Sequence, residues 1–68
     1  MCYFDYVKAA REAGIPDDKL DQLRALVEAE FPGDDMMVEL HLLRACKAVR
    51  DGRATLQEVL RPDPAAAA

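Results

Sequence analysis

One stretch of this sequence, MMVELHLLRACKAV at residues 36–49, is apolar on nearly every side of the helix it would form. At about 100° per residue, one stripe spans about 80° of the helix surface. That stripe contains Val38, Leu42, Ala45, Cys46 and Val49. Met36, Leu40 and Leu43 form a second stripe well away from the first, and Met37 and Ala48 form a third beside His41 and Arg44. A helix that is apolar around most of its circumference must be surrounded by other elements.

The chain is short for such a helix. Its 68 residues make one domain at most, and we predict a single helical domain over residues 1–61 with a disordered Pro/Ala tail at 62–68. The remaining helices can cover only part of the surface of the 36–49 stretch. A second copy of the chain is the simplest cover for the rest, so we expect a homo-oligomer, with a dimer favoured.

Turn signals divide the chain clearly. They are Gly14-Ile15-Pro16, Pro32-Gly33, Asp51-Gly52 and Pro62-Asp63-Pro64. Every segment between them has helical periodicity, and we find no strand candidate. The predicted fold class is therefore all-α: a compact bundle of three main amphipathic helices at about 2–13, 17–31 and 34–51, plus a short fourth at about 55–61. Because the connections are short, we expect sequential helices to run antiparallel.

Local signals support these boundaries. Gly14 suits the C-terminal cap of the first helix, Asp34 or Asp35 can cap the third, and Thr55 and Glu58 fit a capping box. The second helix has the clearest apolar stripe, made of Leu20, Leu23, Leu26, Val27 and Phe31. In the first helix the apolar face comprises Cys2, Tyr3, Tyr6, Val7, Ala9, Ala10 and Ala13. Phe4 is the exception, because it projects among the charged residues of that helix.

Few residues here are suited to catalysis. His41 has Met37, Arg44 and Ala45 as its helical neighbours, and none of them can act as a nucleophile or as an orienting carboxylate. Cys46 lies on the main apolar stripe, as a small core residue would, and Cys2 has no hydrolase constellation beside it. We therefore predict a non-enzymatic protein with no catalytic residues, no metal site and no cofactor. An enzyme that uses His41 or Cys2 is the opposing hypothesis.

The charge and the cysteine content of the chain limit the classes of partner and the cellular compartment that we expect. The chain has 13 acidic and 9 basic residues. Proteins bind nucleic acid largely through Lys and Arg contacts to its phosphates, so we do not expect this chain to bind nucleic acid. Residues 17–35 carry seven acids and two bases, a net charge of minus five, whereas residues 36–61 carry three acids and five bases, a net charge of plus two. No apolar run is long enough for a membrane span. With two cysteines 44 positions apart and no signal peptide recognised, we expect a cytoplasmic, prokaryotic protein.

The surplus apolar surface leads to a functional hypothesis. We expect a small acidic protein-interaction module that self-associates through its third helix and binds another protein, of unknown identity. The predicted interface residues are Phe4, Met36, Met37, Leu40, His41, Leu43 and Arg44. The alternative is an acidic inhibitor that masks a nucleic-acid-binding surface on a partner enzyme. Its phosphate-mimicking cluster would be Asp17, Asp18, Asp21, Glu28, Asp34 and Asp35.

The segment GRATLQEVLR, residues 52–61, is similar to a closing segment of type II secretion and pilus assembly ATPases. The resemblance covers ten residues, and the chain contains no phosphate-binding Gly-Lys loop. We attribute it to a shared way of capping a helix and infer no function from it.

Overall fold

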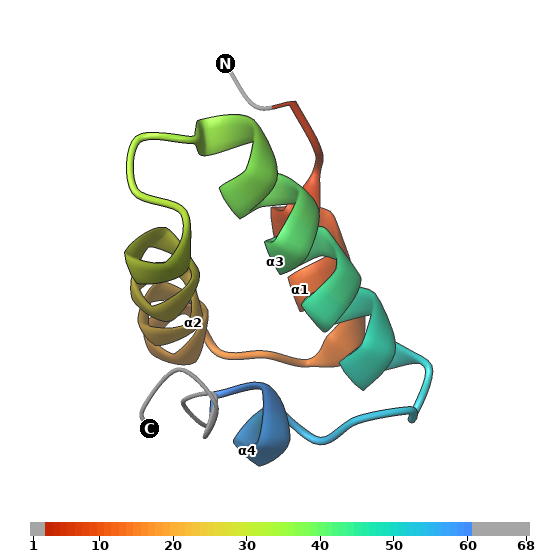
Figure 1. The fold of residues 1–68 in the computed structure, drawn as a ribbon. Helices are drawn as coiled ribbons and strands as arrows, with labels where there is room; N and C mark the ends of the chain where they lie inside the picture. The colour runs from red at the N-terminus through yellow and green to blue at the C-terminus, as the bar shows by residue number, and fades with distance from the viewer. Residues whose placement is uncertain (1–2, 61–68) are drawn as a thin grey trace.

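Four helices account for most of residues 3–60, the part of the chain that the computed structural model describes. They are α1 (Tyr6–Ala13), α2 (Asp17–Glu30), α3 (Asp35–Arg50) and α4 (Leu56–Val59) (Figure 1). Over this range there is no strand, and the predicted all-α class with three main helices and a short fourth is confirmed. Arg61 and the tail predicted to be disordered, residues 62–68, lie outside the described residues.

The predicted capping residues set most helix ends. Asp34 caps α3, because its carboxylate accepts the backbone N–H of Met37 at 3.2 Å. Gly14 ends α1 in the left-handed conformation, with φ at 74°. The capping box of α4 is present: Thr55 Oγ1 accepts the N–H of Glu58 at 3.1 Å, and Glu58 Oε1 accepts the N–H of Thr55 at 3.3 Å. The helix that follows has four residues, so it is shorter than predicted.

The start of α1 differs from the prediction. The helix begins at Tyr6 rather than near Cys2, and the Asp5 carboxylate caps it by accepting the N–H of Lys8 at 3.1 Å. Residues 3–5 form a non-helical N-terminal strap. The apolar pattern placed Tyr3 on the buried face of the first helix, where we expected it to be a core residue. This expectation is wrong, because Tyr3 precedes the helix and is 64% exposed.

Phe4 lies in the same strap and is half-buried. The prediction that it projects from the charged side of the first helix is therefore wrong. The Phe4 backbone N–H and that of Tyr3 both donate to Glu39 Oε1 of α3, at 3.3 and 2.9 Å. These hydrogen bonds hold the strap against α3, although Glu39 is more than 30 positions away in the sequence.

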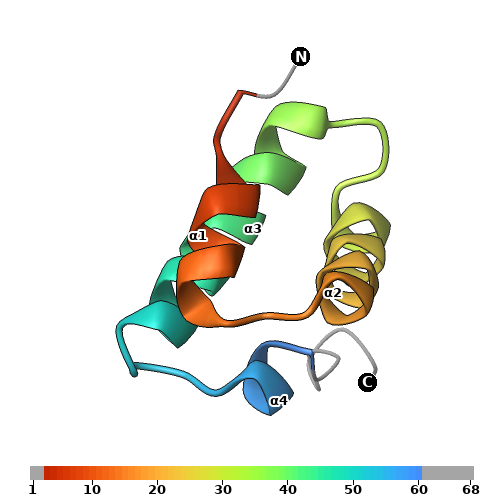
Figure 2. The same cartoon turned by 180° about the vertical axis from the view of Figure 1, so that it is seen from behind.

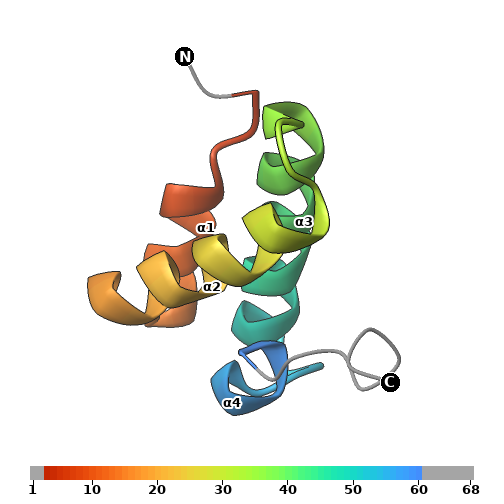
Figure 3. The same ribbon diagram turned by 60° about the vertical axis from the view of Figure 1, so that its left-hand side comes forward.

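α1 and α3 lie side by side and run in the same direction (Figures 1 and 2). Hydrogen bonds mark both ends of the pair: the strap before α1 bonds to Glu39 in the first half of α3, and Glu12 near the end of α1 pairs with Arg50 at the end of α3, at 3.2 Å. α2 crosses this pair steeply (Figure 3). The expectation that sequential helices run antiparallel is therefore wrong, because α2 crosses its two neighbours instead of running back along them (Figure 3). A three-residue turn containing glycine can join helices at a large angle, and Ile15 anchors this one by being buried.

The core fills the space between α3 and the two helices that contact it. Leu23 of α2 and Val38, Leu42 and Cys46 of α3 are its most deeply buried large side chains. From α1 come Tyr6, Ala9 and Ala10. The two alanines are small, so the backbone of α1 can approach α3 closely.

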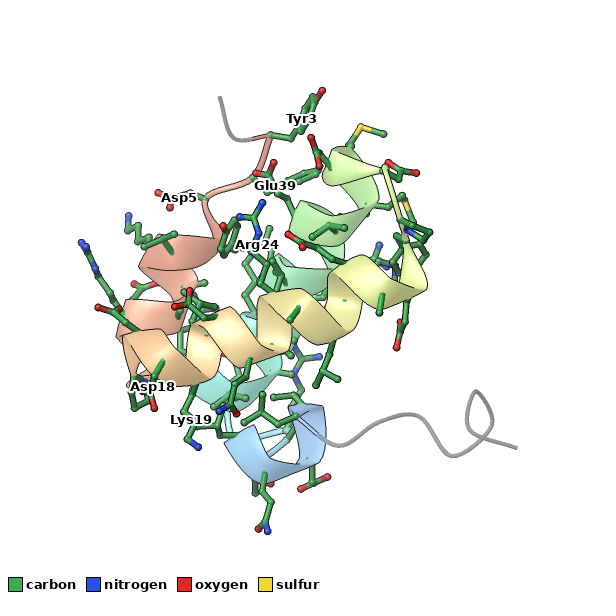
Figure 4. The ribbon with its side chains drawn as sticks, turned by 90° about the vertical axis from the view of Figure 1, so that its left-hand side faces the viewer. Tyr3, Asp5, Asp18, Lys19, Arg24 and Glu39 are labelled. Carbon is green, nitrogen blue, oxygen red and sulfur yellow. The ribbon has the colours of Figure 1, made fainter. Side chains whose placement is uncertain are left out.

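A second contact joins α2 to α1. The Arg24 guanidinium donates to Glu28 Oε1 at 2.6 Å and to the hydroxyl of Tyr6, and its carbon lies 5.7 Å from the centre of the Tyr6 ring. Arg24 points from α2 toward α1 in Figure 4. This cation–π and hydrogen-bond contact keeps the phenol hydroxyl satisfied at the edge of the core.

Candidate interaction surface

The inner face of α3 is filled by its own chain. Val38, Leu42 and Cys46 are each at most 2% exposed, and they pack against residues of α1 and α2. The first apolar stripe of the sequence is thus the core-facing stripe, as its pattern predicts.

The outer face of α3 carries a second apolar row. Met36, Leu40 and Leu43 follow one another at spacings of four and three, so they project from one side of the helix. Met36 is 50% exposed, while Leu40 and Leu43 are half-buried. Leu43 also packs in part against the core. We call these three residues the outer row. They lie where a solvent-facing helix of a small domain normally carries polar side chains.

The other predicted interface residues of α3 lie beside the outer row. Met37 and His41 are half-buried and Arg44 is exposed. The His41 ring stacks on Phe31, with ring centres 4.5 Å apart and planes at 28°. His41 is therefore held in part by the segment that joins α2 to α3, and this partner was not foreseen from helical spacing alone.

Glu39 is the residue of this region that the sequence analysis missed. It is 5% exposed, the one buried charged residue among those described. It holds the N-terminal strap, so the exposed Tyr3 lies at this end of α3, as Figure 4 shows. Met36 is one helical turn before Glu39. An acid flanked by Val38 and Leu40 was the available signal, because a charge placed among apolar residues needs specific hydrogen bonds.

Cys46 is the cysteine that residues 3–60 contain, whereas Cys2 lies outside the described residues. Cys46 is a free, fully buried thiol, and burial raises its pKa, which disfavours the nucleophilic thiolate. Residues 3–60 contain no group of three or more His, Cys, Asp or Glu side chains placed to hold a metal ion.

The acidic residues of α2 form a different surface. Asp17, Asp18 and Asp21 are exposed and make no ion pair within residues 3–60. Glu28, predicted to belong to the same cluster, is instead paired with Arg24 at 2.6 Å. The phosphate-mimicking set is therefore reduced on α2 to three aspartates near its N-terminal end.

None of the helices described here is both long enough and apolar enough to cross a membrane. Comparisons with protein-family models, with curated proteins and with solved structures found no match to this chain.

Proposed function

We propose that this protein is a small non-enzymatic interaction module that self-associates through the outer face of α3 and, in that form, binds another protein. The observation that carries the proposal is the outer row of Met36, Leu40 and Leu43, which lies outside the filled core face of α3 and is buried only in part. Apolar side chains that lie together and stay partly in water can mark an interface.

The non-enzymatic part of the proposal rests on where the reactive groups lie. His41 is stacked on an aromatic ring, and Cys46 is buried with its pKa raised. We further propose that the protein works in the cytoplasm of a prokaryotic cell. A free buried thiol suits a reducing compartment.

The test is the mass of the particle in solution, measured by light scattering at low micromolar concentration. We expect the wild type to scatter as a dimer. Met36→Lys and Leu40→Lys should shift it toward the monomer, because each places an ammonium group in the interface. Burying an apolar side chain of this size contributes about 1.5–3 kcal/mol, so either variant should raise the dissociation constant at least about tenfold.

Gln22→Lys is the matched control, since Gln22 is exposed on α2 and the same side chain is introduced. It should leave the mass unchanged. Circular dichroism of all three variants checks that the helices persist. A wild type that stays strictly monomeric would refute the self-association.

The runner-up is an inhibitor that masks a nucleic-acid-binding surface on an enzyme, favoured by the three exposed aspartates of α2, Asp17, Asp18 and Asp21. It predicts release of a labelled oligonucleotide from such an enzyme at low salt. Changing all three aspartates to Asn should abolish that release, and equal release by both proteins would count against the inhibitor.

A further inference from the structure

The outer row continues beyond its apolar residues with the spacing of a coiled-coil seam. Met36, Leu40, Leu43 and Lys47 follow at steps of four, three and four residues, the a/d pattern of a heptad repeat. At about 100° per residue these four positions fall within about 60° of the helix surface. Their centre lies about 130° around α3 from the centre of the buried row of Val38, Leu42 and Cys46. We call these four residues the outer seam.

The two ends of this seam differ in charge. Asp34 and Asp35 stand at the start of α3, and both are exposed. At the other end Arg50 is already paired with Glu12 and Asp51. Lys47 is exposed and has no ion pair within residues 3–60. Of the cations in the last two turns of α3, Arg44 is also exposed without an ion pair within residues 3–60, but Lys47 is the one that lies on the outer seam.

Only one relative direction makes two such seams complementary. If two copies paired in parallel, Lys47 would face Lys47 of the second copy, and the acidic first turns would also meet. Like charges placed directly opposite one another destabilise a pairing. If the copies pair antiparallel, Leu40 lies opposite Leu43 of the second copy, and Met36 lies opposite Lys47. The acidic first turn then lies level with the basic last turn.

We propose that a second copy of this chain docks on the outer seam in an antiparallel, two-fold arrangement. The proposal rests on the self-association proposed above and adds its geometry. The central contact is Leu40 with Leu43, made twice because the interface is isologous. At each end the methylene stem of Lys47 covers Met36 of the other copy, while the ammonium group extends toward Asp34 and Asp35 of that copy. Tyr3, held at the same end of α3 by Glu39, widens the face there.

Disulfide trapping tests this geometry. In a Cys2→Ser background, Met36→Cys and Lys47→Cys are made separately and mixed under a glutathione redox buffer. The antiparallel seam predicts a 36–47 disulfide in the mixture. Met36→Cys alone should not cross-link, because the two copies of position 36 are separated by about 16 Å along the helix axis, whereas a disulfide needs Cα atoms within about 7 Å.

Both substituted positions are exposed, so the fold should survive, and circular dichroism checks it. Gln22→Cys, on the exposed face of α2, gives the rate of random collision. A 36–47 product formed at least about tenfold faster than the Gln22→Cys product supports the antiparallel seam. Rapid cross-linking of Met36→Cys with itself would overturn it, as would a rate equal to the control in every sample.

Light scattering of the unmodified wild type separates the two proposals. A dimer that fails the trapping test overturns only the antiparallel seam. A strict monomer overturns the proposed self-association, and the seam with it.

Discussion

Replacing Glu39 removes the group that holds the N-terminal strap on α3. Glu39 is 5% exposed, and one oxygen of its carboxylate accepts two backbone N–H groups, at 2.9 Å from Tyr3 and 3.3 Å from Phe4. A hydrogen bond to a charged group contributes about 1.5–3 kcal/mol. The second bond is longer and shares its acceptor, so it adds little to the first.

Removing the carboxylate also removes the cost of burying it, which offsets part of this contribution. We therefore expect Glu39→Ala to lower the free energy of unfolding by about 2 kcal/mol. For a domain of this size that corresponds to a fall in melting temperature of about 8–16 °C. Glu39→Gln keeps an acceptor oxygen but loses its charge, so it should cost about 1 kcal/mol.

Urea unfolding followed by circular dichroism measures these differences. Amide hydrogen exchange supplies a local readout, because in Glu39→Ala the N–H groups of Tyr3 and Phe4 should exchange as fast as in an unfolded chain. Glu30→Ala is the matched control, since Glu30 is exposed on α2 and makes no side-chain hydrogen bond within residues 3–60. If Glu39→Ala unfolds at the wild-type urea concentration and keeps the protection of both amides, the strap is not held in the way argued here.

Three further predictions concern stability. Leu42 is completely buried in the core, so Leu42→Ala should cost about 2–5 kcal/mol; Leu26→Ala, at a half-buried position, should cost clearly less in the same urea titration, and equal losses would contradict this account of the core. Burial raises the pKa of the Cys46 thiol, so the unfolded chain gives up this proton first and stability should fall as the pH rises above about 8.5. Cys46→Ala should flatten that alkaline slope, whereas an unchanged slope would show that another group causes it. The hydrogen bond from Arg50 lowers the pKa of Asp51, so its contribution should be present above about pH 4 and disappear as the pH falls through the lowered pKa. Asp51→Asn should remove this acid-side loss from a series of urea midpoints, and a loss of the same size in the variant would be inconsistent with the Arg50–Asp51 contact.

The features predicted correctly from sequence are those set by residues near one another in the chain. Gly14 ends α1, and Thr55 with Glu58 caps α4, because each acts on backbone groups within a few positions. The core stripe of α3 was also predictable, since a 3.6-residue period fixes which side chains share a face.

The features that were missed depend on contacts between distant residues. The backbone N–H groups of Tyr3 and Phe4 donate hydrogen bonds to Glu39, and no local pattern in residues 3–5 predicts these contacts. The direction of α2 was also mispredicted: it crosses α1 and α3 steeply instead of running antiparallel to them (Figure 3). A short loop limits the distance between helix ends but leaves the crossing angle open. Lys47 was not predicted as an interface residue, because a search for apolar stripes does not count lysine. The methylene stem of a lysine can nevertheless cover apolar surface.

The shared direction of α1 and α3 has an electrostatic consequence for the whole molecule. Each helix has a positive partial charge of about 0.5 at its start and a negative one at its end, and in a parallel pair these add instead of cancelling. Asp5, Asp34 and Asp35 lie at the positive end of this pair. The acids at the starts of α1 and α3 therefore do more than cap backbone groups, because they also reduce the repulsion between two like helix termini. Neutralising them together should weaken the packing of α1 on α3 by more than the sum of the individual caps.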